Sequence, residues 1–150
     1  MAPAGRCCVI EGLRDMLAAI DPPPFRHIGL AAEYASLDAP PPPARLPAAY
    51  VIETTDTAEA NGLLTGGVRQ RLTRGFAVVF LVSTLRDDKG GQATISLAPL
   101  RQAVRVALLG GAPSDAYEPI TYSRGRLLAA ERGILAWQDE YQARTMLRSA

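Results

Sequence analysis

The chain has 150 residues, of which 48% are hydrophobic and 21% are charged, and its net charge is +1. This length suits a single domain over residues 1–150 with one core, and the composition excludes a disordered chain. The near-neutral charge gives no general attraction to nucleic acid or to a membrane surface. The arginines outnumber the single lysine by fifteen to one. That excess fits a GC-rich coding bias and also fits ionic contacts at protein interfaces.

The hydrophobic runs and the cysteines of the sequence predict the cellular compartment of the protein. No apolar run approaches the roughly 18 residues that a membrane-spanning helix needs. Glu11 and Asp15 lie inside the first hydrophobic segment, which argues against a signal peptide. Cys7 and Cys8 are the only cysteines, and neighbouring cysteines rarely form a disulfide. We therefore expect a soluble intracellular protein with free thiols and no membrane partner.

The first third of the chain predicts short elements between proline-rich connections. Apolar residues recur at helical spacing over residues 9–20, and the prolines at 22–24 end that helix. Residues 25–30 favour a short strand, and residues 31–37 favour a helical turn. The proline run at 40–43 predicts a stiff, polyproline-like connector.

The middle of the chain predicts a strand that is too long for the domain. Residues 49–54 read as a buried strand, and the polar stretch 55–67 is a candidate contact loop. The strand 68–84 is amphipathic in its first half and apolar on both faces in its second half. At about 3.3 Å per residue it spans roughly 55 Å, whereas a compact domain of this size is about 40 Å across. Either the strand bends, at Gly75, or its basic end leaves the body.

A second long helix is expected over residues 96–111, after a turn at "RDDKGG". Ser96 is the expected N-cap, Pro99 falls in the first turn, and the final glycine pair supplies the C-terminal cap. Arg101 and Arg105 are expected on the side of this helix opposite its buried stripe. The stripe consists of Leu97, Leu100, Val104 and Leu108.

The C-terminal segments 120–129 and 134–147 predict a long β-hairpin that turns through a left-handed Gly133. The order of elements predicts an α+β fold with a mainly antiparallel β-sheet. Two helices pack on one face of the sheet, and long strands extend beyond the core. The predicted core consists of Val9, Leu13, Leu17, Val51, Phe76, Val78, Phe80, Val82, Leu100, Val104, Leu108 and Trp137.

The residues that carry chemistry form no recognisable site. His27 is the only histidine and has no cysteine or carboxylate at ligand spacing, so a surface or hydrogen-bonded role is expected. Metal-binding and phosphate-loop motifs are absent. Asp87 and Asp88 fall in a turn, while Asp139 and Glu140 point to opposite faces of a strand and cannot act as a pair. We therefore predict no enzymatic activity, no cofactor and no metal.

Nucleic-acid binding has some support from arginines on the predicted sheet. Arg69, Arg71 and Arg74 lie in one strand, and Arg124 and Arg126 lie in another. A protein that reads single strands also exposes aromatic side chains on such a surface. The phenylalanines of the long strand instead fall in its apolar half. No specific nucleic-acid binding is expected, and a small nucleic-acid-binding α+β module stays open as an alternative.

Assembly explains the overlong strands best. Segments 68–84, 120–130 and 134–148 carry charges beyond their apolar centres, and such extensions leave open edges unless another chain pairs with them. A ring of identical subunits with head-to-tail contacts would cover them. The candidate interface residues, for contacts between subunits and with a further partner, are Arg69, Arg71, Arg74, Asp87, Asp88, Arg124, Arg126 and Glu140.

Five segments, in order and spacing, resemble the tail terminator (tail completion) proteins of long-tailed bacteriophages. The resemblance covers nearly the whole chain and is structural, without a catalytic signature. The segments are "VIEGLRDMLAAI", "AAYVIE", "TGGVRQRLTRGFAVVFLV", "LAPLRQAVRVALLGGAP" and "GRLLAAERGILAWQDEYQARTMLR".

The resemblance implies a structural virion protein at the junction of tail and neck, assembled in the host cytoplasm. It implies a ring, usually a hexamer, that caps the head-proximal end of the tail tube and stops its polymerisation. The implied partners are further copies of the chain, the tail tube protein and the stopper protein of the head's neck, and the end of the tape-measure protein is a further candidate. Another neck or head–tail joining protein of phages remains an alternative.

Overall fold

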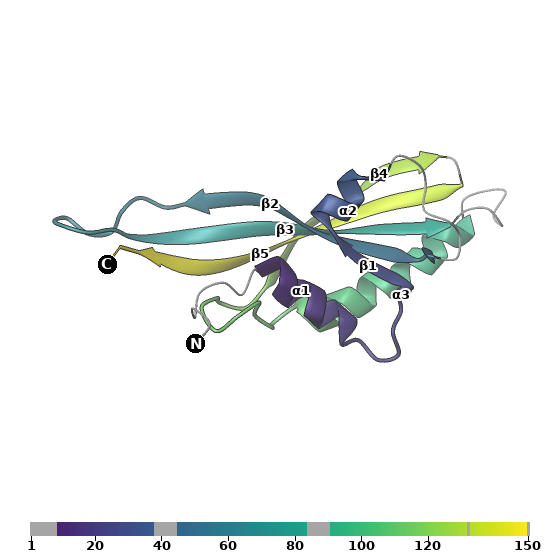
Figure 1. Cartoon of the computed structure of the whole chain (residues 1–150), viewed down its shortest axis with the longest axis horizontal. Helices are drawn as coiled ribbons and strands as arrows, with labels where there is room; N and C mark the ends of the chain where they lie inside the picture. Colours follow the sequence, from purple (N-terminus) through teal and green to yellow (C-terminus); the bar gives the residue numbers. More distant parts are fainter. Residues whose placement is uncertain (1–8, 38–44, 84–90, 132, 150) are drawn as a thin grey trace.

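The computed structural model describes residues 9–37, 45–83, 91–131 and 133–149, with side chains from residue 97 onward in the third of these ranges. It is an elongated α+β molecule, in which helices lie along one part of a long sheet (Figure 1). The elements are α1 (Val9–Ala18), β1 (His27–Leu30), α2 (Ala31–Ala35), β2 (Ala48–Ala58), β3 (Arg69–Ser83), α3 (Gly91–Leu108), β4 (Thr121–Glu131) and β5 (Ile134–Arg148).

The five strands form one sheet in the order β1-β2-β3-β5-β4. β1 pairs with β2 in parallel, and every other pair is antiparallel. β3 lies at the centre and pairs along its whole length with β5, from Arg69 opposite Arg148 to Ser83 opposite Ile134. The prediction of a mainly antiparallel sheet in an α+β fold is confirmed.

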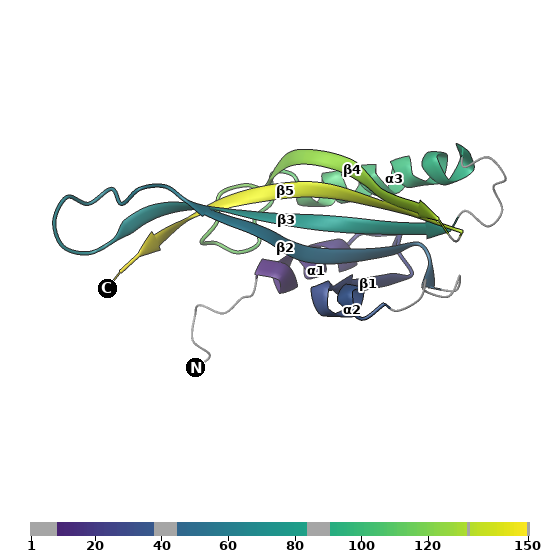
Figure 2. The same ribbon diagram turned by 90° about the horizontal axis from the view of Figure 1, so that it is seen from above.

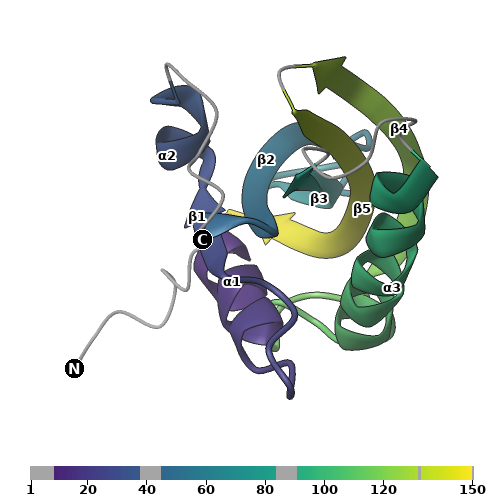
Figure 3. The same ribbon diagram turned by 90° about the vertical axis from the view of Figure 1, so that its right-hand side faces the viewer.

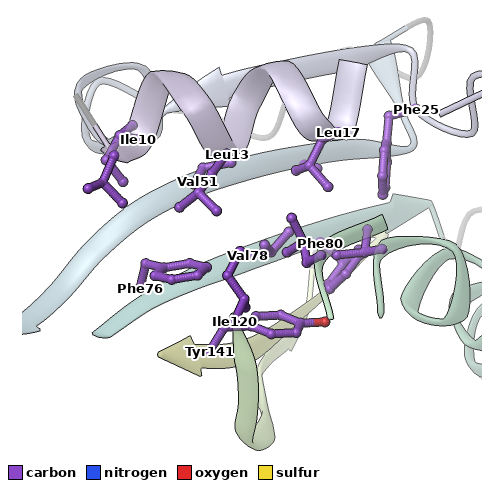
Figure 4. Close-up of a cluster of buried hydrophobic side chains, with 14 of the residues drawn as sticks. Ile10, Leu13, Leu17, Phe25, Val51, Phe76, Val78, Phe80, Ile120 and Tyr141 are labelled. Carbon is purple, nitrogen blue, oxygen red and sulfur yellow. The ribbon is translucent and has the colours of Figure 1, made fainter. Parts of the chain in front are cut away.

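The core lies between the sheet and the two larger helices. Leu13 and Leu17 of α1 point onto Val51, Val78 and Phe80 of the sheet, as Figure 4 shows. Buried residues of α3 join the same cluster, so both helices cover one face, as predicted (Figure 3). We call this the helix-side face of the sheet.

The opposite face of the sheet holds a second, smaller cluster. Tyr50, Val79 and Leu81 are buried there, and Tyr34 of α2 packs against them. β3 is therefore buried on both sides from Phe76 to Val82, as its doubly apolar sequence predicts. Of the predicted core, all members are buried except Leu100 and Trp137, which are half-buried and pack against the cluster.

α3 differs from its prediction at its beginning and on its polar face. The helix begins at Gly91, so Pro99 lies inside it and not in the first turn, and Ser96 is not the N-cap. A proline inside a helix removes one backbone hydrogen bond, and the burial of Leu97 and Val104 on the sheet offsets that loss. The expected C-terminal cap is confirmed, because Gly110 has φ +80°.

The sheet is longer on one side than the sequence predicted. β2 continues to Ala58, so the first residues of the expected loop 55–67 are strand residues paired with β3. The hairpin between β4 and β5 forms as predicted, with Gly133 at φ +75°. The proline run 40–43 and the cysteine pair 7–8 lie outside the described residues. None of the described helices is long and apolar enough to cross a membrane.

Candidate assembly surface

Three strands leave the body of the molecule together and form an arm. The arm comprises residues 54–75 and 142–149, and Figure 2 shows it projecting away from the helices. β1 pairs with β2 only as far as Val51, and β4 pairs with β5 only as far as Gln142. Beyond these points no described strand flanks the arm, and on the β5 side the amide of Glu118 donates to the Arg144 carbonyl at 2.8 Å. The outer edge of β2 in the arm has no flanking strand among the described residues.

The arm begins at a bulge opposite Gly75. The register of β2 shifts between Glu53 and Thr55, and Thr55 then lies opposite Gly75 of β3. A side chain at Gly75 would collide with the Thr55 hydroxyl, so a larger residue fits beneath the bulge only if the Thr55 side chain moves. Bulges bend and twist a strand pair. The bulge belongs to β2, whereas the long strand β3 keeps an unbroken register with β5 through Gly75. Its basic end leaves the body, which is the second of the two predicted alternatives.

The chain itself closes the helix-side face of the arm. The Nε of Arg74 donates to Asp56 at 2.9 Å, and its Nη1 donates to the Tyr117 hydroxyl at 3.0 Å. The hydrogen bond to Asp56 raises the pKa of Arg74, and burial raises the pKa of Tyr117. Below them Leu72 and Ala143 are buried. Arg74 is therefore a structural residue within one chain.

The other face of the arm carries four arginines, which we call the arginine face. Arg69 and Arg71 of β3 share this face, and the register places Arg148 opposite Arg69 and Arg144 opposite Thr73. Arg71 is half-buried and the other three are exposed. Among the described residues none of the four forms an ion pair.

The tip of the arm is an ordered loop with apolar side chains. The Asn61 carboxamide oxygen accepts from the amides of Leu63 and Arg69, at 3.2 and 2.8 Å, and its Nδ2 donates to the Gly67 carbonyl at 3.1 Å. Gly66 and Gly67 have positive φ, so the turn needs glycine there. The loop exposes Leu64 completely, at 101% of its reference surface. Leu63, Val68 and Leu147 are the other exposed large apolar side chains in the arm.

The predicted interface residues do not form one patch. Arg124 and Glu140 pair with each other across β4 and β5, and the hydrogen bond from Arg124 lowers the pKa of Glu140. They line a polar hollow of about 240 Å³ at the base of the arm, together with Gly75. Arg126 is exposed near them. Asp87 and Asp88 lie outside the described residues.

Sequence reasoning missed two members of the arginine face. Arg144, Met146 and Arg148 lie at every second position of β5 and so share one face of the strand. This spacing was visible in the sequence. Their meeting with the arginines of β3 was not visible, because it depends on the register between two strands that are far apart in the sequence. The arginine face therefore consists of two predicted and two unpredicted residues.

Arg101 and Arg105 were placed on the wrong side of α3. Both face the sheet, where Arg101 binds the fully buried Asp139 through Nε and Nη2, each at 3.0 Å. Arg101 also lies 4.5 Å from the centre of the Trp137 ring, and Arg105 lies 4.8 Å from that of Tyr122. Their partners on β4 and β5, and not the helical period, decide where these two side chains point.

His27 has the hydrogen-bonded role that its sequence context predicts. Its Nε2 lies 2.9 Å from Glu33, and its ring contacts that of Tyr50 edge-on. No group of three or more potential metal ligands occurs among the described residues. The described part of the chain thus offers a candidate assembly surface with open strand edges.

The fold and the arm define an α+β structural subunit. A family model described as "Phage tail terminator protein" matches residues 9–150. The chain belongs to the phage tail terminator family, so it is a structural virion protein and not an enzyme.

A solved chain from the "virion of native gene transfer agent (GTA) particle" is similar at 17% sequence identity, with a TM-score of 0.49. That similarity covers 93% of this chain and 92% of the other. No curated protein matches the sequence.

Proposed function

We propose that this chain forms a ring that caps the head-proximal end of a phage tail tube. The ring, a hexamer on the family's pattern, stops polymerisation of the tube at its final length. It then forms the joint to the neck of the head, where the stopper protein is the partner. The tube protein binds one side of the ring, and the end of the tape-measure protein is a further candidate contact.

The arm is the observation that carries this proposal. Three strands extend beyond the core with open edges, and unpaired edges normally invite another chain. The tip adds an exposed leucine on a loop held by three hydrogen bonds, and exposed apolar groups of this kind are typical of contact sites. A monomer gains little from such a structure, whereas a ring can cover it.

The double variant Arg69→Ala with Arg71→Ala tests the proposal. Neither side chain has an ion-pair partner in the described part of the chain, so the melting temperature of the monomer should change little. Ring formation should fail, and tails assembled with this variant should exceed the normal length. The matched control is Arg26→Ala with Arg45→Ala, which changes two exposed arginines outside the arm. Normal rings and normal tails from this alanine variant would show that the two arginines do not carry the contact, and a wild-type chain that forms no ring, alone or on tail tubes, would contradict the proposal.

A nucleic-acid-binding module is the second candidate, because four unpaired arginines also suit phosphate groups. On that reading the wild-type chain binds duplex oligonucleotides with an affinity that falls steeply as salt rises. An oligonucleotide titration at two salt concentrations separates the two functions.

A further inference from the structure

We propose that the arginine face of one copy lies against an acidic surface on the helix side of the next copy. This inference rests on the proposed ring and names the surfaces that join its subunits. The acidic surface is formed by α1 and by the segment 112–119. The partner of the arm is thus a second copy of this chain.

The arginine face is electrostatically incomplete within one chain. The register sets Arg69 directly opposite Arg148, and like charges opposite each other destabilise a strand pair. Arg71 lies on the same face, two residues further along the strand. Of the nearby carboxylates, Asp56 is bound to Arg74 on the other face, which leaves Glu59, whose amide donates to the Arg71 carbonyl, as one carboxylate beside four arginines. Carboxylates from another molecule would remove this repulsion.

The chain covers only part of the sheet on the arginine side. α2 and its flanking residues pack there against Tyr50 and Val79, close to the body. The helix-side face of the arm, by contrast, is closed by the segment 112–119, in which the Ala116 carbonyl accepts from Thr145 and the Tyr117 hydroxyl accepts from Arg74. The helix-side face of the arm is therefore covered by the same chain, whereas no described segment covers the arginine face.

The helix side of the molecule carries the complementary charge. Glu11 and Asp15 lie one helical turn apart on α1, and both are exposed. Asp115 and Glu118 are exposed in the neighbouring segment. Among the described residues of α1 and of the segment 112–119, the one basic residue is Arg14, which reaches Asp15 at 4.0 Å. Carboxylates therefore outnumber cations on this surface.

The two surfaces belong to one body but cannot meet within one copy. α1 packs against the segment 112–119 where Gly12 touches the Pro113 carbonyl, so the acidic residues share one rigid region. That region covers the helix-side face of the sheet, whereas the arginine face is on the opposite side. When copies follow one another in the same orientation, the arginine face of each copy meets the acidic surface of the next copy at every contact. A head-to-tail contact of this kind closes into a ring.

Reciprocal charge reversal tests this contact. The arm variant is Arg71→Glu with Arg148→Glu, the acidic variant is Glu11→Arg with Asp15→Arg, and the fourfold variant combines both. Sedimentation velocity of the full chain at rising sodium chloride measures assembly, and the melting temperature reports folding. Each double variant should need at least about tenfold more protein to assemble, because close charge pairs at interfaces couple by more than about 1.4 kcal/mol. The fourfold variant should recover most of that loss.

The control and the contrary outcomes separate this inference from the proposed function. Arg26→Glu with Arg45→Glu changes charge equally at exposed sites outside the arm and should assemble normally. Assembly of the wild type and the arm variant at equal concentrations would overturn the inference and leave the ring intact. A wild type that assembles neither alone nor after mixing with tail tubes would overturn both. Loss of duplex DNA binding in the arm variant, with unchanged assembly, would assign the face to nucleic acid and overturn the inference.

Discussion

Asp139 is the residue on which the interior of the molecule depends most. Its side chain is fully buried and receives hydrogen bonds from Arg101, from the Trp137 indole at 2.9 Å and from the Tyr122 hydroxyl at 3.3 Å. A buried charge is tolerated only with such partners. Gly125 lies against this carboxylate, where a larger residue would collide with it. The network joins α3 to β4 and β5.

We predict that Asp139→Ala lowers the free energy of unfolding by about 3–5 kcal/mol, because it leaves Arg101 without its counter-ion. Urea denaturation measures the change. Glu140→Ala is the matched control, since this neighbour points to the other face and pairs with the exposed Arg124. Equal stability losses for the two variants would show that the buried network contributes nothing special.

The Arg124–Glu140 pair should make a small pH-dependent contribution. The hydrogen bond from Arg124 lowers the pKa of Glu140 below its ordinary value of 4.5. A lowered folded-state pKa gives stability that is present above the unfolded-state value and is lost as the pH falls through the folded-state value. The stability difference between wild type and Glu140→Gln should therefore be present at neutral pH and disappear in acid. A difference that grows below about pH 4 would contradict this assignment.

Single residues also show the limits of sequence reasoning. The apolar period predicted Leu13, Val78 and Phe80 correctly, because helix and strand periods place such residues on a buried face. The same reasoning placed Arg101 outward, because arginine is usually exposed and its partner Asp139 is 38 residues away. Charge pairs over that distance leave no periodic signal in one sequence.

Elements were predicted by kind more reliably than by length. The hydrophobic runs identified the central strands, whereas the polar residues after Ile52 hid the continuation of β2 to Ala58. Pairing with β3 keeps those residues extended, which their local sequence does not require. Pro99 likewise suggested a helix start, although the helix begins eight residues earlier. Tertiary packing decided both lengths.

The loop at the tip of the arm should depend on Asn61. Asn61→Ala removes the three side-chain hydrogen bonds that hold the loop, so residues 59–68 should become more open to proteolysis and to amide hydrogen exchange. Global stability should change little, because Asn61 is exposed. Asn61→Asp keeps the acceptor for the Leu63 and Arg69 amides. Its loop should therefore exchange faster than that of the wild type and more slowly than that of Asn61→Ala. Unchanged exchange at those amides in Asn61→Ala would contradict this account of the loop.

The shape of the whole molecule is what the sequence indicated through a single overlong strand. A strand of roughly 55 Å could not be covered by a domain of about 40 Å, and the structure resolves this with an arm built from β2, β3 and β5. The sequence did not indicate which face of the arm the chain would close. That outcome depends on the segment 112–119, in which Tyr117 reaches Arg74.

The mass of the native assembly, measured on the full chain alone and after mixing with tail tubes, tests the proposed ring most directly. Low-dose microscopy of the same samples shows whether the particles are rings and whether they sit at tube ends. We predict a closed assembly of several 16.0 kDa chains, six on the family's pattern, free in solution or formed on the tube end. A chain that stays at 16.0 kDa in both samples and never caps a tube would contradict the account.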